Sequence, residues 1–235
     1  MFVRDCMSSP AVTITPDTPF QVALKAMHDH KFRRLPVVDK NGRLAGIVSE
    51  RDLLHASPSP ASSLSVWEMN YLLAKLTVQQ IMTRAIIITS PDTPIEHAAS
   101  LMVANKIGGL PVVDENDRVV GMITETDIFK VFVEMMDGKE GVRLTVDLPD
   151  NEDLSFDFIE AIHRRGGHLT AMGTVAHNAG KRRVVVVVRG LAREMLDEPL
   201  QLLGSSLVDA FELSVPVGIA LPPVAKNGKV KLPAR

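Results

Sequence analysis

Aromatic side chains and cysteine are scarce in this chain. Its 235 residues include one cysteine, Cys6, one tryptophan, one tyrosine and eight phenylalanines. A single cysteine cannot form an internal disulfide, so the sequence excludes a secreted domain held together by such bonds. The core must be filled by aliphatic residues and methionine instead. With 46% apolar residues, the chain has enough of them to fold.

Charge of one sign and long hydrophobic runs are also missing. Lysine and arginine number 26 against 28 aspartates and glutamates, a net charge of −2, so a long-range attraction to DNA, RNA or an anionic membrane is absent. The longest aliphatic run, Val184–Val188, is far shorter than the roughly 20 residues of a membrane-spanning helix. The first residues lack the apolar stretch of a secretory signal. We therefore expect a soluble, cytoplasmic protein whose partner is neither a nucleic-acid polymer nor a membrane.

An internal repeat organises the first half of the chain. Residues 3–56 align with residues 78–131 at a constant offset of 75 without a gap, and 19 of the 54 aligned positions are identical. The identities include Pro-Asp-Thr-Pro, at 16–19 and 91–94, and Leu-Pro-Val-Val-Asp, at 35–39 and 110–114. The sequence therefore predicts two structurally equivalent copies.

Each copy has the pattern of a β-α-β-β-α unit. A short extended stretch (11–14 and 86–89) precedes Pro-Asp-Thr-Pro, whose Asp or Thr can cap the helix that follows. Apolar residues then recur at helical spacing, and Leu-Pro-Val-Val-Asp begins a strand, a turn and a second strand. The last helix starts at Ser49 or Thr124, each of which can be its N-cap. Between the copies we expect a Pro/Ser linker at 57–63 and a packed linker helix at 66–76 that joins the second copy to the first.

The motif Gly-x-x-Ser/Thr-x-x-Asp occurs once in each copy, in register with Leu-Pro-Val-Val-Asp. Its two occurrences span Gly46–Asp52 and Gly121–Asp127. A hydroxyl and a carboxylate three residues apart at the start of a helix lie on one face and can both point into a cleft. Backbone N–H groups at the same helix start favour an anion. With these motifs, residues 1–136 resemble a tandem pair of CBS domains, the Bateman module.

The resemblance implies a ligand and the residues that hold it. Pairs of this family bind adenosine nucleotides or related compounds in clefts between the copies, so AMP, ADP or ATP is the implied regulatory ligand, with no cofactor required. The carboxylates would accept hydrogen bonds from ribose hydroxyls, the hydroxyls would contact ribose or phosphate, and the arginines would bind phosphate. Glycines replace the arginines in the second copy, so the two clefts should differ, and the sequence does not assign the arginines to either cleft. The adenine would be held by aliphatic and backbone contacts rather than stacked on a ring. The implied ligand-binding residues are Thr13, Ile14, Arg33, Arg34, Ser49, Asp52, Ile88, Thr89, Gly108, Gly109, Thr124 and Asp127.

Purely structural roles explain many of the same residues. Ser49 and Thr124 can be helix caps alone, and Asp52 and Asp127 can be first-turn acids favoured by the helix dipole. The two arginines can belong to a solvated face. The motif glycines are better explained as backbone requirements than as ligand contacts.

Residues 141–215 predict a third domain. Strands are expected at 142–148, 168–176, 183–189 and 207–213, with helices at 154–165 and 192–203 and turns at 149–153 and 177–180. This is the ferredoxin-like β-α-β-β-α-β order. With its strand-Leu-Pro-Asp-loop-helix opening, the segment resembles an ACT domain, a family of small-molecule sensors that pair through their sheets. Ligand-binding ACT domains usually carry a glycine in that loop, and residues 151–153 contain none, so a structural or dimerising role is favoured over an amino-acid site.

The predicted fold class is therefore α/β (α+β). It comprises CBS domains at 1–60 and 78–136, a linker and helix at 61–77, an ACT-like domain at 141–215 and a tail at 216–235. The whole chain resembles the acetoin-utilisation regulatory proteins, a resemblance that does not establish acetoin chemistry here. Helices that carry Met27 and Met102, together with a long apolar helix at 129–136, predict a homodimer.

No catalytic motif accompanies these binding groups. The histidines form no His-Glu-x-x-His motif, and the spacing of His28 and His30 places them on different helix faces. Cys6 has no base near it in sequence, and there is no nucleophile elbow, phosphate loop or dinucleotide fingerprint. We therefore expect a regulatory, ligand-sensing protein rather than an enzyme, which signals to an unidentified protein target through dimer or domain rearrangement. The alternatives are a constitutive scaffold with empty clefts and an enzyme that acts on a small metabolite.

Overall fold

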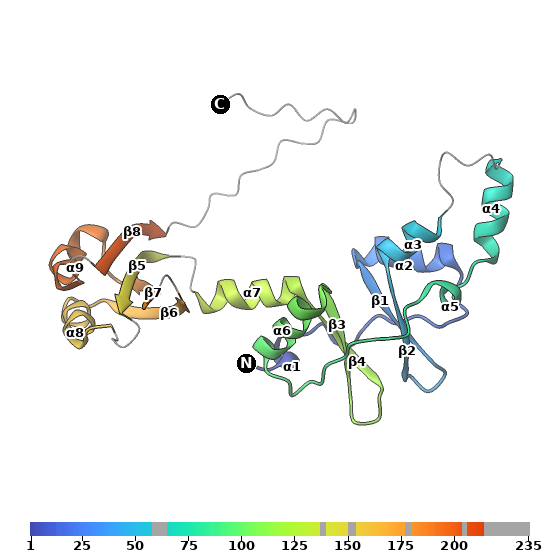
Figure 1. The fold of residues 1–235 in the computed structure, drawn as a ribbon, viewed down its shortest axis with the longest axis horizontal. Coiled ribbons are helices and arrows are strands. Elements are labelled where there is room, and N and C mark those ends of the chain that lie inside the picture. Colours follow the sequence, from blue (N-terminus) through green and yellow to red (C-terminus); the bar gives the residue numbers. More distant parts are fainter. Residues whose placement is uncertain (58–64, 137–139, 150–153, 177–179, 204–205, 214–235) are drawn as a thin grey trace. The chain divides into compact units, whose positions relative to one another are not determined.

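A computed structural model describes residues 1–57, 65–136, 140–149, 154–176, 180–203 and 206–213. The chain divides into two compact units, Met1–Val131 and Phe132–Arg235, which are considered separately (Figure 1). Most of the expected Pro/Ser linker, most of the turns at 149–153 and 177–180, and the tail at 216–235 lie outside the described residues.

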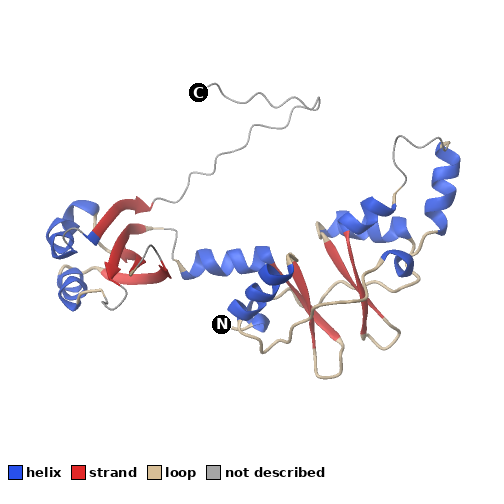
Figure 2. Cartoon of the chain, viewed as in Figure 1, coloured by secondary structure: helices blue, strands red, loops and turns tan. Residues whose placement is uncertain are grey.

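The first unit contains the two repeat copies, joined through one additional helix (Figure 2). Within each copy the two strands form an antiparallel hairpin, β1 with β2 and β3 with β4. The expected helix, strand, turn, strand and helix are therefore confirmed in both copies. The elements are α1 (Val3–Cys6), α2 (Phe20–His30), β1 (Arg34–Val38), β2 (Leu44–Ser49) and α3 (Glu50–Ala56), then the linker helix α4 (Val66–Lys75), then α5 (Val78–Ile81), α6 (Ile95–Asn105), β3 (Gly109–Val113), β4 (Val119–Thr124) and α7 (Glu125–Met135).

Two local expectations are wrong. The stretches 11–14 and 86–89 form no strand, because each meets its hairpin at a single residue, Ile14 beside Val37 and Thr89 beside Val112. Helices α2 and α6 begin after Pro19 and Pro94 with no side-chain cap. The Thr18 hydroxyl accepts a hydrogen bond from the Thr15 N–H at 3.1 Å instead, so this threonine closes the preceding turn.

The short first helix of each copy packs into the core of the other copy. Val3 of α1 is fully buried among second-copy residues such as Leu110, and its N–H donates to the Thr93 carbonyl at 2.9 Å. Val78 of α5 is fully buried in the first-copy core, and its N–H donates to the Thr18 carbonyl at 2.9 Å. The two copies therefore complete each other's cores.

The motif glycines pack closely against the exchanged segments. A Cβ added at Gly121 would lie 2.6 Å from Sδ of Met7, and a Cβ at Gly46 would collide with Sδ of Met82. Real Cβ atoms do not approach sulfur so closely, so a larger residue at either position would displace a methionine side chain, and at Gly121 it would also meet the Ser8 carbonyl oxygen at 3.0 Å. The structural explanation of these glycines is supported, and Met7 and Met82, which occupy equivalent positions of the repeat, make the equivalent contact in the two copies.

Several apolar side chains lie differently from expectation. Met27 and Met102 are buried in the two cores, so the expectation that they present a surface to a second copy is wrong. The linker helix α4 packs on the first copy through Leu73, whereas Trp67 on the same helix is 86% exposed. The helix exists as expected, but it is packed along one side only.

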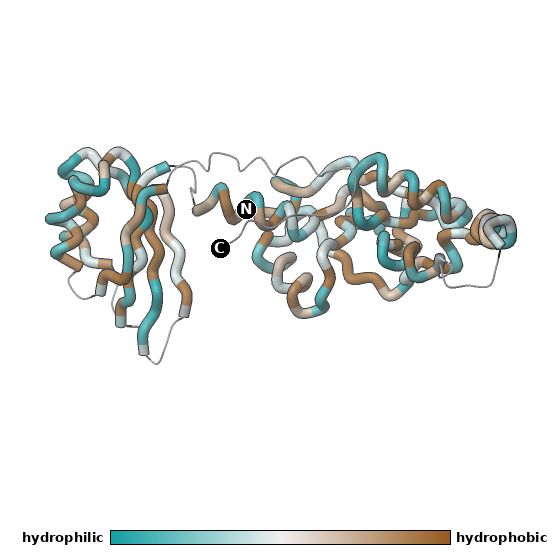
Figure 3. Tube along the Cα trace, turned by 90° about the horizontal axis from the view of Figure 1, so that it is seen from above, coloured by the Kyte–Doolittle hydropathy of each residue, from teal (hydrophilic) through white to brown (hydrophobic). Residues whose placement is uncertain are grey.

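The second unit is one antiparallel sheet with helices packed on one face. The β-α-β-β-α-β order is confirmed, with strand order β6-β7-β5-β8. Alternate residues of β5 and β7, such as Leu144 and Val186, form the core with Phe158 and Ile162 of α8. Brown and teal segments alternate along the helices of this unit in Figure 3, as expected for helices buried on one side. The elements are β5 (Gly141–Pro149), α8 (Phe156–Arg164), β6 (His168–Ala176), β7 (Lys181–Arg189), the 3-10 helix η1 (Arg193–Leu196), α9 (Asp197–Leu203) and β8 (Leu207–Leu213).

The last predicted helix differs in its first turn. Residues 193–196 form a 3-10 turn before α9 begins at Asp197. Pro199 lies in the first turn of α9, where its missing N–H breaks no hydrogen bond within the helix. Across the described part of the chain, no helix is both long and apolar enough to cross a bilayer.

Candidate functional site

The motif hydroxyls and carboxylates form equivalent hydrogen-bonded caps in the two copies. In the first copy, Asp52 Oδ2 accepts hydrogen bonds from the Ser49 N–H at 2.8 Å and the Ser49 hydroxyl at 2.6 Å. In the second copy, Asp127 Oδ2 accepts from the Thr124 N–H at 3.0 Å and the Thr124 hydroxyl at 2.7 Å. Only one oxygen of each carboxylate is used in the cap. The capping role is therefore real, and it leaves Oδ1 of each aspartate for other contacts.

Backbone N–H groups at these helix starts are also in use. The Glu50 N–H donates to the Arg33 carbonyl at 2.9 Å, and the Glu125 N–H donates to the Gly108 carbonyl at 3.3 Å. The expectation that the helix starts offer free N–H groups to an anion is therefore wrong for these groups.

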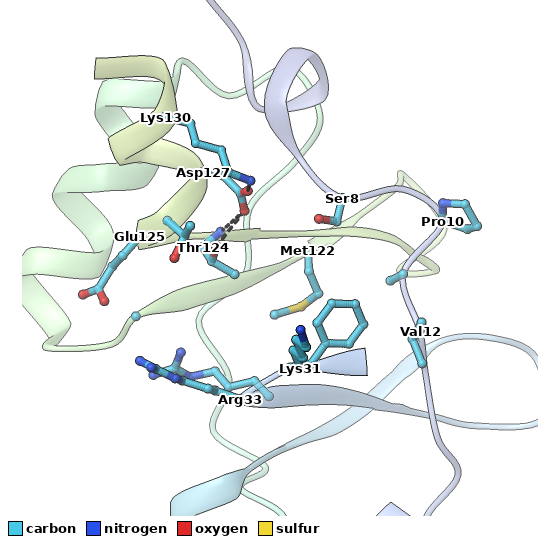
Figure 4. Close-up of a pocket in the computed structure, with 15 residues that line it drawn as sticks. Ser8, Pro10, Val12, Lys31, Arg33, Met122, Thr124, Glu125, Asp127 and Lys130 are labelled. Atoms are coloured by element: carbon cyan, nitrogen blue, oxygen red, sulfur yellow. Dashed lines mark hydrogen bonds and ion pairs between the residues drawn. The ribbon is translucent and has the colours of Figure 1, made fainter. Parts of the chain in front are cut away.

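A cavity of about 440 Å³ opens between the two copies, beside the second-copy cap (Figure 4). Its walls come from four places: the segment after α1, the residues between α2 and β1 with the start of β1, the residue before β3, and β4 with the first turns of α7. We call it the inter-copy cavity. Its lining residues are Ser8, Pro10, Ala11, Val12, Lys31, Phe32, Arg33, Arg34, Gly108, Met122, Thr124, Glu125, Thr126, Asp127 and Lys130.

Positive charge predominates in the inter-copy cavity. Lys31, Arg33, Arg34 and Lys130 line it, against the carboxylates of Glu125 and Asp127. Asp127 is 8% exposed, and its Oδ1 lies 3.6 Å from Lys130 Nζ. A cavity with this balance attracts an anion and still offers a carboxylate as a hydrogen-bond acceptor.

Gly108 lets two charged groups approach each other. A Cβ built on Gly108 would lie 2.7 Å from Glu125 Oε2 and 3.1 Å from both terminal nitrogens of Arg34. Any larger residue would therefore displace the Arg34 guanidinium or the Glu125 carboxylate. The glycine that replaces Arg33 in the second copy makes room for Arg34 of the first.

One side of the inter-copy cavity is apolar. Pro10, Ala11, Val12 and Met122 line it together with the ring of Phe32, which is 37% exposed. The cavity thus contains one aromatic ring, which the prediction of aliphatic and backbone contacts to adenine did not include. A planar base can contact Phe32 as well as aliphatic groups.

The structure brings together five of the twelve residues implied by the sequence: Arg33, Arg34, Gly108, Thr124 and Asp127. Both arginines thus belong to the cavity beside the second-copy cap. The remaining seven, namely Thr13, Ile14, Ser49, Asp52, Ile88, Thr89 and Gly109, do not line it. Ser49 and Asp52 keep the capping geometry, while Ile14 packs against the first-copy core and Thr89 is buried.

Sequence reasoning missed ten of the lining residues: Ser8, Pro10, Ala11, Val12, Lys31, Phe32, Met122, Glu125, Thr126 and Lys130. Lys31 and Phe32 directly precede Arg33, and Lys130 is one helical turn after Asp127, so spacing could have indicated these three. The residues from Ser8 to Val12 reach the cavity because α1 crosses to the second copy, which no local pattern indicates.

A second hollow, of about 840 Å³, lies along α2 and the residues Lys31–Arg33. We call it the outer groove. It shares Lys31, Phe32 and Arg33 with the inter-copy cavity. Its lining residues are Gln21, Leu24, Lys25, Met27, His28, Lys31, Phe32, Arg33 and Glu50.

Metal-ligand geometry is not found near either hollow. Within the described ranges, no group of three or more His, Cys, Asp or Glu side chains could hold a metal ion. The ring of His30 stacks on Phe32 at 5.5 Å between centroids, and His28 is largely exposed.

Cys6 provides a chemical probe beside the site. Burial raises the pKa of the Cys6 thiol above its ordinary value, and the negative charges of Asp127 and Asp5 raise it further. Because the thiolate is the reactive form, we expect iodoacetamide at pH 8 to alkylate Cys6 more slowly than an unstructured cysteine peptide. Asp127→Asn should speed the reaction and Asp52→Asn should not. Alkylation as fast as in the peptide would contradict this assignment.

Known proteins resemble the chain over the repeat region. The family model of the CBS domain matches residues 3–59 and 78–134. A CBS domain-containing protein of Dictyostelium discoideum is 34% identical over 137 residues, which cover 58% of this chain and 94% of that protein. An L-aspartate semialdehyde sulfurtransferase of Methanocaldococcus jannaschii is 34% identical over 130 residues. That match covers 55% of this chain and only 23% of the sulfurtransferase, so the enzyme's name describes a protein of which this chain spans less than a quarter.

A solved structure in this group contains bound adenosine compounds. The CBS domain pair of protein MJ0100, in complex with 5'-methylthioadenosine and S-adenosyl-L-methionine, is 34% identical in sequence, with a TM-score of 0.48. The alignment covers 57% of this chain and 97% of that chain.

Proposed function

The chain belongs to the CBS domain family, and on that premise we propose that it is a regulatory protein that binds an adenosine nucleotide in its inter-copy cavity. One observation carries the proposal: a single cavity combines an apolar side, a carboxylate and four cationic side chains drawn from both copies. These are the groups that a base, a ribose and a phosphate require.

The proposal assigns a role to each group. The base lies against Phe32, Val12 and Met122. Asp127 Oδ1 accepts hydrogen bonds from ribose hydroxyls, since Oδ2 is held by Thr124. The phosphate is bound by Arg33 and Arg34, whose forked guanidinium groups match phosphate oxygens.

Any second site, beside the first-copy cap at Ser49 and Asp52, would differ from the inter-copy cavity in its charge. The second copy offers Gly108 and Gly109 at the positions of the two arginines, and glycine supplies no charge. The affinity of a ligand bound near Asp52 would therefore depend less on contacts to its phosphate.

Signalling follows from the position of the inter-copy cavity. Because residues of both copies line it, a ligand that bridges them favours the arrangement in which they lie closest. Helix α7 starts at this cavity and exposes the apolar residues Phe129, Phe132 and Val133. We propose that this face forms a homodimer or contacts a target protein, with an affinity that the ligand changes.

The second unit is proposed to be an ACT-like dimerisation domain. Its strand order and its single helix-covered face support this role. Most of the loop whose lack of glycine argues against an amino-acid site lies outside the described residues. A link to acetoin utilisation stays a prediction from resemblance.

Calorimetric titration with AMP, ADP, ATP and S-adenosylmethionine tests the proposal. We expect binding of at least one nucleotide, and Arg33→Ala with Arg34→Ala should weaken it by about 2 kcal/mol or more, roughly 30-fold, because two charge-assisted contacts are lost. Both arginines have exposed or half-buried side chains, so the variant should fold. Failure of all four compounds to bind at millimolar concentration would refute a ligand-sensing role.

A constitutive scaffold is the second candidate. The satisfied caps favour it, because Ser49 with Asp52 and Thr124 with Asp127 bond to each other without help from a ligand. A scaffold would keep its oligomeric state and thermal stability unchanged when nucleotides are added, whereas a sensor would not.

A further inference from the structure

The outer groove adjoins the inter-copy cavity. Lys31, Phe32 and Arg33 line both hollows, so this short segment is the wall between them. The side chains of Lys31 and Arg33 are therefore available to a ligand in either hollow.

The outer groove carries nitrogen groups of its own that can donate hydrogen bonds to a phosphate. Lys25 and His28 project from consecutive turns of α2 and line the outer groove but not the inter-copy cavity. With Lys31 and Arg33 they stand against one acid, Glu50. Such a row of donors suits a chain of phosphates more than a single anion.

The fold itself does not need these charges. The second copy has Ser100, Val103 and Gly108 at the positions of Lys25, His28 and Arg33, and it forms the same helix and hairpin. The two copies can therefore be compared as the same fold with and without these residues. Lys31 is matched by Lys106, but the nitrogen groups of Lys25, His28 and Arg33 occur in one copy only and are not a requirement of the architecture.

We propose that the outer groove binds the distal phosphates of a nucleotide whose base and ribose occupy the inter-copy cavity. The preferred ligand class is then a nucleoside tri- or tetraphosphate rather than a monophosphate. This inference rests on the proposed function and refines it. Lys31 and Arg33 contact the phosphates nearest the ribose, and Lys25 and His28 contact the far end.

The test compares ligands of different chain length on one variant of the full-length protein. Lys25→Ala with His28→Ala removes only groups that are absent from the inter-copy cavity, and alanine suits the helix that carries them. The matched control, Lys40→Ala with His97→Ala, removes the same residue types from exposed positions that line neither hollow. Calorimetry would measure AMP, ATP, adenosine tetraphosphate and inorganic tripolyphosphate with all three proteins at one ionic strength.

We expect the Lys25 and His28 variant to bind ATP and adenosine tetraphosphate roughly three- to tenfold more weakly, because these contacts are exposed to solvent and partly screened. Its affinity for AMP should stay within twofold of wild type, and the control should match wild type for every nucleotide. An equal loss for AMP and ATP, or no loss for either, would overturn the inference while leaving the proposed function intact. Tripolyphosphate that binds as tightly as ATP would also overturn it, because the base and ribose would then contribute nothing to the affinity. Wild-type protein that binds no nucleotide would refute the proposed function and this inference with it.

Discussion

Asp127→Ala is expected to weaken nucleotide binding by about 2 kcal/mol or more, roughly 30-fold, and to reduce the stability of the first unit by only about 1 kcal/mol. The loss of affinity follows from Oδ1, which is directed toward the inter-copy cavity in the proposed complex and accepts the ribose hydroxyls. The loss of stability follows from Oδ2, which holds the Thr124 N–H and hydroxyl. Calorimetry and a denaturant titration measure the two effects separately.

Asp52→Ala is the matched control for this experiment. Asp52 makes the same pair of hydrogen bonds with Ser49, so its replacement should cost a similar amount of stability. It does not line the inter-copy cavity, and nucleotide affinity there should stay within about twofold of wild type. If the two variants lost affinity equally, the effect of Asp127→Ala would be a consequence of the lost cap, and the ribose role would be wrong.

Val3→Ala is expected to destabilise the second copy more than the first, although Val3 lies at the start of the first copy in sequence. Val3 is fully buried in the second-copy core, and removal of two buried methyl groups should cost about 2 kcal/mol, including the space left behind. Hydrogen exchange should show the larger loss of protection at the Leu110 amide in β3 and the smaller loss at the Leu35 amide in β1.

Val78→Ala should give the reverse result. Val78 is fully buried in the first-copy core, so Leu35 should lose more protection than Leu110. The two variants make the same chemical change at equivalent positions of the repeat, and each controls for the other. A larger loss at Leu35 in Val3→Ala would contradict the exchange of α1 and α5 between the copies.

The secondary structure could be predicted from the sequence because its signals are local. The 75-residue offset, the Leu-Pro-Val-Val-Asp strands and the Ser49 and Thr124 caps all depend on neighbours within a few residues. The exchange could not be predicted in this way. Val3 and Val78 are the same residue at equivalent positions, so either valine fits either core, and the choice depends on long-range packing.

The candidate site was predictable in part for the same reason. Thr124, Asp127 and the two arginines belong to short motifs, and all of them line the inter-copy cavity. The residues Ser8 to Val12 reach that cavity only through the exchange. The Gly108 carbonyl accepts a hydrogen bond from the Glu125 N–H. Because this contact joins two backbone groups, no residue type indicates it, and the sequence could not show that this N–H already has a partner.

A crystal structure of the full-length protein grown with AMP would test the central claim most directly. The account predicts a nucleotide in the inter-copy cavity, with its ribose hydroxyls within hydrogen-bond distance of Asp127 Oδ1 and its phosphate on Arg33 and Arg34. A nucleotide bound beside Asp52 with the inter-copy cavity empty would contradict it.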